Sequence, residues 1–162
     1  MIVVDANILA FYLIEGKRTQ EAHALRKYDA EWLVPSFWSI EFQSILWKYM
    51  RFNGMPEEDA LVLMKTALSL FSANELTPSP IAVLKDATQW GITVYDAQYV
   101  SLAKQFGVHC ITEDGPLQEK CPEIALSIDS YIKQSGNGKL LRESKATYRT
   151  RRKKRPPPQL ET

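Results

Sequence analysis

The first seven residues constrain the fold more than any other stretch of the chain. Residues 2–4 are Ile-Val-Val, and a carboxylate, Asp5, and an amide, Asn7, come just after them. An uninterrupted β-branched run is typical of a parallel strand that is buried on both faces. An ionised side chain beside such a strand is costly unless it is paired, hydrogen-bonded or bound to a metal. Because open parallel sheets bind ligands beyond the carboxyl ends of their strands, Asp5 is a candidate site residue.

Strand-like and helix-like stretches alternate along the chain after this first strand. This alternation is typical of an α/β fold, a three-layer α/β/α sandwich with a central, mainly parallel sheet. Further strands are predicted over residues 31–35, 74–77, 108–112 and 126–128. Helices are predicted over residues 8–14, 19–28, 37–52, 56–71, 80–90, 95–103 and 117–121.

The charge of the chain divides it into two parts. The 162 residues suit one domain, which we place at residues 1–134, with eleven Lys and Arg against seventeen Asp and Glu. Residues 135–162 hold nine Lys and Arg against two acidic residues, and three consecutive prolines. We predict a basic, disordered tail there. It is either a segment that contacts an acidic partner or a solvated segment without function.

The cysteines and the N-terminus bear on the compartment. Two cysteines, Cys110 and Cys121, do not make a disulfide framework and suggest a reduced protein. The N-terminus has no basic segment, and Asp5 interrupts its apolar run, so neither a signal peptide nor a membrane span is expected. We therefore expect a cytoplasmic protein that does not enter the membrane.

Four acidic residues occupy unusual positions. Asp5 and Asp114 follow predicted strands, Glu41 lies on the inward stripe of a predicted helix, and Asp96 lies in the first turn of another. Carboxylates that are brought together repel each other unless cations neutralise them. Oxygen ligands select Mg²⁺ or Mn²⁺, and no pair of histidine and cysteine has the spacing of a zinc site. Divalent ions held in this way commonly serve the hydrolysis of phosphodiesters.

Four motifs that carry these acids resemble those of the PIN-domain ribonucleases. They are Val-Asp-Ala-Asn at residues 4–7, Glu41 early in an apolar helix, Val-Tyr-Asp-Ala-Gln-Tyr at residues 94–99, and Ile-Thr-Glu-Asp at residues 111–114. They occur in the order of that family over roughly residues 1–132. In length, the chain is most similar to the small VapC-like toxins of toxin–antitoxin pairs. The tail beyond residue 134 has no counterpart in this pattern.

The resemblance implies a function and a role for each residue. It implies Mg²⁺- or Mn²⁺-dependent cleavage of RNA, a homodimer, and inhibition by a cognate antitoxin. Asp5 and Asp96 would be direct metal ligands. Asp114 would be a ligand or orient the attacking water, and Glu41 would be a general base or a ligand. The polar helpers of the family fall on Asn7 and Thr112.

Each assignment has a simpler alternative. Asp114 belongs to an Asp-Gly pair that is common in turns, and Asn7 could cap a helix. Glu113 is expected to be solvated. The functional alternatives are a catalytically silent RNA-binding protein that acts through its basic tail, and a phosphatase or receiver domain. The latter lacks a second aspartate, because Asn7 stands in its place.

Overall fold

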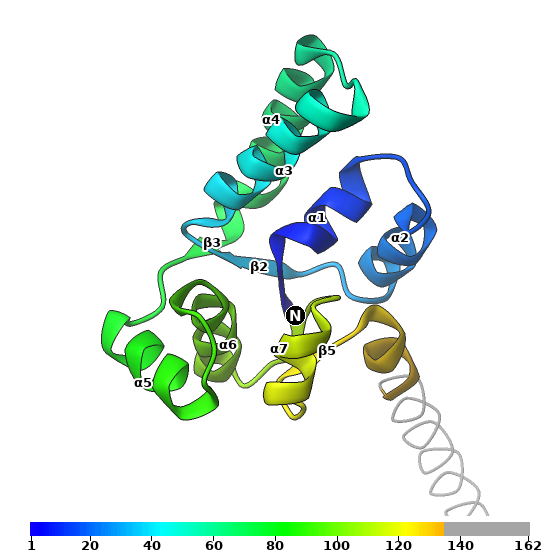
Figure 1. The fold of residues 1–162 in the computed structure, drawn as a ribbon. Coiled ribbons are helices and arrows are strands. Elements are labelled where there is room, and N and C mark those ends of the chain that lie inside the picture. The colour runs from blue at the N-terminus through cyan, green and yellow to red at the C-terminus, as the bar shows by residue number, and fades with distance from the viewer. Residues whose placement is uncertain (135–162) are drawn as a thin grey trace, which may run out of the picture.

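A five-stranded, wholly parallel sheet forms the centre of the molecule (Figure 1). The computed structural model describes residues 1–134, and the predicted tail at residues 135–162 lies outside the described residues. The strand order is β3-β2-β1-β4-β5, which places the N-terminal strand in the middle. The strands are β1 (Ile2–Val4), β2 (Trp32–Pro35), β3 (Glu75–Leu76), β4 (Cys110–Ile111) and β5 (Ala125–Leu126).

Helices cover both faces of this sheet, which confirms the predicted α/β sandwich. The first four helices share one hydrophobic core with the sheet, α6 packs on the opposite face, and α5 packs on α6. The helices are α1 (Ala6–Leu13), α2 (Thr19–Tyr28), α3 (Trp38–Asn53), α4 (Glu57–Phe71), the 3₁₀ turn η1 (Ser72–Asn74), α5 (Pro80–Trp90), α6 (Val94–Phe106) and α7 (Gly115–Lys120).

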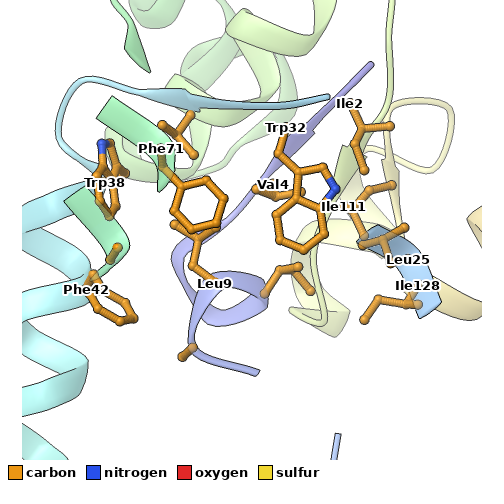
Figure 2. Close-up of a cluster of buried hydrophobic side chains, with 14 of the residues drawn as sticks. Ile2, Val4, Leu9, Leu25, Trp32, Trp38, Phe42, Phe71, Ile111 and Ile128 are labelled. Atoms are coloured by element: carbon orange, nitrogen blue, oxygen red, sulfur yellow. The ribbon is translucent and has the colours of Figure 1, made fainter. Parts of the chain in front are cut away.

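The buried β-branched run at the N-terminus divides its side chains between the two faces. Ile2 and Val4 enter the larger core, beside Trp32 and Phe71, whereas Val3 packs on the α6 side (Figure 2). All three strand residues are completely buried, as expected for a central parallel strand. Helices on both faces therefore explain why the run is continuous and does not alternate with polar residues.

The order of the strands determines where a site can form. From β1 the chain passes first to β2 and β3 on one side, and later to β4 and β5 on the other. The carboxyl ends of β1 and β4 are therefore neighbours at the point where the topology reverses. Asp5 follows β1 and Thr112 follows β4. The strand predicted over residues 108–112 is shorter than expected and pairs only at Cys110–Ile111.

Helices α3 and α4 form an antiparallel hairpin that projects away from the sheet (Figure 1). Gly54 ends α3 with φ of 72°, and its N–H bonds the carbonyl of Tyr49. This left-handed conformation favours glycine because a Cβ atom would be strained there.

We expect Gly54→Ala to lower the free energy of unfolding by about 1 kcal/mol, since alanine must adopt the left-handed region. The measurement is urea unfolding followed by circular dichroism. Gly115→Ala is the control, because Gly115 has no positive φ and no atom lies within 4 Å of the added Cβ. Equal stability of both variants and the wild type would contradict the role of Gly54.

Candidate active site

A cavity of about 200 Å³ opens at the carboxyl ends of β1 and β4. Its walls come from four separate parts of the chain, and they include all four carboxylates that the sequence singled out. The residues that line it are Asp5, Ala6, Asn7, Glu41, Ser44, Ile45, Lys48, Asp96, Tyr99, Asp114 and Leu117. Thr112 does not line the cavity, but its hydroxyl donates a hydrogen bond to Asp5, which does.

Asp5 is buried at the centre of the site, with only 7% of its surface exposed. One carboxylate oxygen accepts the backbone N–H groups of Asn7 at 2.7 Å and Ile8 at 3.1 Å, which caps α1. The other accepts the hydroxyl of Thr112. The helix cap is therefore Asp5, and the alternative role of Asn7 as the cap is wrong. Asn7 instead lies exposed beside the cavity.

Asp96 and Asp114 also lie at helix N-termini. Asp114 accepts the N–H of Leu117 at 2.9 Å and caps α7. Asp96, in the first turn of α6, accepts the hydroxyl of Thr93 at 2.7 Å. Three helix N-termini thus converge on the cavity, and the partial positive charge at each end stabilises a nearby carboxylate. This convergence offsets part of the repulsion among the acids.

Glu41 reaches the cavity from the first turn of α3, and Tyr99 of α6 donates its hydroxyl to the Glu41 carboxylate. Burial, with smaller effects of Asp5 and Asp96, raises the pKa of Glu41 above its ordinary value. Burial also raises the pKa of Tyr99, so its hydroxyl stays protonated and remains a donor. Glu41 is therefore half-buried beside the cavity, on the inward side of α3.

Within residues 1–134, no three His, Cys, Asp or Glu side chains are gathered tightly enough to form a ready-made metal-binding group. The four carboxylates face one cavity, yet each is hydrogen-bonded to its own partner. The donors are all oxygen atoms, which fits a hard divalent cation.

Burial raises the pKa of Asp5 to about 6, from an ordinary value of 3.8. Hydrogen bonds from Thr112, Ile8 and Asn7 oppose this shift only in part. Because the folded protein binds the proton more tightly than the unfolded chain, this proton stabilises the fold fully below pH 3.8. The stabilisation is lost as the pH rises through about 6.

This linkage predicts how the stability of Asp5→Asn compares with that of the wild type. We consider the free energy of unfolding of Asp5→Asn minus that of the wild type, both measured in EDTA. This difference should fall by roughly 2–3 kcal/mol as the pH falls from 7 to 4. Urea unfolding of both proteins across this range measures the difference, so that the titration of all other groups cancels. A difference that does not change with pH would contradict the burial of an ionised Asp5.

Two features of the site, the contacts of Glu113 and the position of Tyr99, were not predicted from the sequence. Glu113 is not solvated: its carboxylate accepts Arg18 at 2.8 Å and the N–H of Ile128 at 3.0 Å. These bonds hold the loop that carries Asp114 against neighbouring segments. Tyr99 was not assigned a role in the site from the sequence, and its position one helical turn after Asp96 is the signal that it faces the same cavity.

Together, the fold and this site define an α/β protein whose carboxylates cluster at the switch point of a parallel sheet. No family model matches the sequence. The chain is 32% identical over 127 residues to Ribonuclease VapC3 of Pyrobaculum aerophilum, which covers 76% of this chain and 96% of that protein.

Solved structures share the same fold. The crystal structure of PAE2754 from Pyrobaculum aerophilum superposes with a TM-score of 0.63 at 26% identity, over 82% of this chain and 87% of that one. A toxin–antitoxin complex from Klebsiella pneumoniae contains a chain that gives a TM-score of 0.54 at 19% identity, over 79% and 98% of the two chains. The protein belongs to the VapC family of PIN-domain ribonucleases, as its motifs indicated.

Proposed function

We propose that the protein is a metal-dependent endoribonuclease and the toxin of a toxin–antitoxin pair. The observation that carries this proposal is the convergence of Asp5, Glu41, Asp96 and Asp114 on one cavity in a member of a ribonuclease family. These residues are up to 109 positions apart and come from the β1–α1 junction, α3, α6 and the segment between β4 and α7. A stabilising role in the fold alone does not require four acids to meet.

The cofactor proposed is Mg²⁺, with Mn²⁺ as a substitute. Asp5 and Asp96 would hold it directly, with Asp114 and Glu41 as further oxygen donors or as donors acting through water. When bound, such an ion supplies Lewis-acid chemistry, lowering the pKa of water and stabilising negative charge on the phosphate. The cavity volume of about 200 Å³ leaves room for several water molecules, at roughly 30 Å³ each.

The chain's own residues would position and deprotonate the attacking water. Glu41 suits a general base because burial moves its pKa towards neutrality. The Tyr99 hydroxyl fixes one Glu41 oxygen, which leaves the other to face the cavity. Thr112 orients Asp5, and it also accepts the N–H of Asp114 at 3.0 Å. Thr112 therefore links two of the proposed ligands, and Asn7 offers an amide for the substrate.

We test this proposal with a fluorescently labelled single-stranded RNA, with Mg²⁺ and with EDTA. The expected result is internal cleavage in Mg²⁺, none in EDTA, and recovery when excess Mg²⁺ is added. Cleavage that persists in EDTA would contradict the metal. Binding without cleavage would favour the catalytically silent alternative, and phosphate release from p-nitrophenyl phosphate would favour a phosphatase.

The proposed partners are RNA, a cognate antitoxin and a second copy of the chain. The Klebsiella structure is a toxin–antitoxin complex, and it supports an antitoxin partner for a protein of the same fold. An open reading frame beside this gene that encodes a small protein with a DNA-binding end would support it further. Among residues 1–134, every helix is too short or too polar to cross a bilayer. Separately, we propose a cytoplasmic location.

A further inference from the structure

We propose that the outer part of α3 is a track for single-stranded RNA, with Lys48 and Arg51 binding phosphates and Trp47 stacking on a base. The inference rests on the proposed ribonuclease function and assigns how that site holds its substrate. The first observation is that the domain and its proposed substrate are both negatively charged. Residues 1–134 carry eleven Lys and Arg against seventeen acids, whereas phosphate contacts normally supply most of the affinity for nucleic acids.

Lys48 is the only cation among the described residues that line the cavity. It lies on the same face of α3 as Glu41, Ser44 and Ile45, two helical turns beyond Glu41. Among residues 1–134, Lys48 forms no ion pair, although four carboxylates share its cavity. An exposed ammonium group that neutralises none of these acids is available to the phosphate that flanks the scissile bond.

From Lys48, the proposed RNA track continues along α3 away from the sheet, on the projecting α3–α4 hairpin (Figure 1). Arg51 follows Lys48 by three residues, so it lies next to Lys48 on the helix surface, and it is exposed. Trp47 also lies beside this row, four residues before Arg51, and is 54% exposed. An exposed tryptophan beside two exposed cations has the composition of a single-stranded nucleic-acid platform.

The Trp47 ring is held in place by a neighbour. Its centroid lies 5.9 Å from that of Phe52, with the two planes at 87°. Such perpendicular pairs stabilise the orientation of both rings. A ring that is oriented beforehand and more than half exposed loses little freedom when a base stacks on it, whichever base that is.

The alternative occupant of this surface is a protein, because Ile40, 66% exposed, lies on the same side of α3 as Trp47. Charge complementarity favours RNA. The two exposed cations lie in a row that starts inside the proposed catalytic cavity, and phosphodiesters carry the opposite charge at regular intervals.

The experiment measures kcat/KM on a labelled single-stranded RNA of about ten nucleotides at several salt concentrations, using the full-length chain. Lys48→Gln and Arg51→Gln should each lower kcat/KM about tenfold through KM and reduce the slope of log kcat/KM against log salt by about 0.7. Lys85→Gln on α5 is the charge-matched control, because Lys85 is exposed and lies outside this cavity.

Stacking is tested by comparing Trp47→Leu with Trp47→Phe. Leucine should lower kcat/KM on the longer RNA roughly 5- to 100-fold, whereas phenylalanine should retain most of it. On a dinucleotide too short to reach Trp47, the leucine variant should approach the wild type. These differences separate stacking from a structural role, which would affect both substrates equally.

The outcomes distinguish this inference from the proposed function. If the wild type cleaves no RNA, the proposed function fails. If it cleaves RNA but the α3 variants keep its KM and salt slope, the track is wrong. A change in the mass of the assembly with Trp47→Leu, at unchanged KM, would also overturn the track and assign the surface to a protein partner.

Discussion

Replacement of Asp5 by asparagine is expected to lower the rate of RNA cleavage by about 10³-fold or more. Asparagine has the same shape and can still accept the N–H groups of Asn7 and Ile8, so the cap of α1 is retained. It removes the negative charge that a divalent cation requires. Loss of several kcal/mol of stabilisation at the reacting phosphate corresponds to roughly this factor, at about 1.4 kcal/mol per tenfold.

The measurement is the single-turnover cleavage rate of a labelled RNA in Mg²⁺, with circular dichroism to verify the fold. Asp129→Asn is the matched control, because Asp129 is largely exposed and pairs only with Lys133 at 3.8 Å among the described residues. Asp96→Asn should resemble Asp5→Asn. A folded Asp5→Asn protein that cleaves at the wild-type rate would show that the assigned site is wrong.

Phe71→Ala is expected to reduce the free energy of unfolding by about 3–5 kcal/mol, a large part of the stability of a domain of this size. Phe71 is completely buried at the end of α4. Its ring stacks on Trp32 at 5.9 Å and meets the edge of Trp38 at 6.1 Å (Figure 2). It therefore joins β2 to α3 and α4, and alanine would leave a cavity between them.

Urea unfolding monitored by tryptophan fluorescence measures this change, since two of the affected rings are tryptophans. Phe71→Leu, which retains much of the volume, should cost far less than alanine. Phe106→Ala, at a partly exposed ring, should also have a small effect. Equal losses for Phe71 and Phe106 would contradict the view that the α3–α4 hairpin depends on this aromatic cluster.

Much of the site could be predicted because its positions follow local rules. Asp5 and Asp114 were placed together because both come after strands of a parallel sheet, whose carboxyl ends share an edge. Glu41 could be placed because a helix repeats every 3.6 residues, which put it on the inward face. The N-terminal run of β-branched residues likewise predicted a central strand, and β1 occupies that position.

The remainder depends on contacts between distant segments, which no local pattern encodes. The hydrogen bond from Thr112 to Asp5 joins residues 107 positions apart, and that from Tyr99 to Glu41 spans 58. Glu113 was expected to be solvated because the strand alternation directs it away from Asp114. Only the fold brings Arg18 to it. Strands β3 and β5 pair over two residues each, too short for periodicity to define their ends.

The proposed function requires that carboxylates from four segments form one divalent-cation site. Titration of Mn²⁺ into the full-length protein by calorimetry tests it most directly. We predict saturable binding to the wild type, weakened at least about tenfold by Asp5→Asn and by Asp96→Asn, and unchanged by Asp129→Asn. Equal Mn²⁺ affinity in all four proteins would contradict the claim.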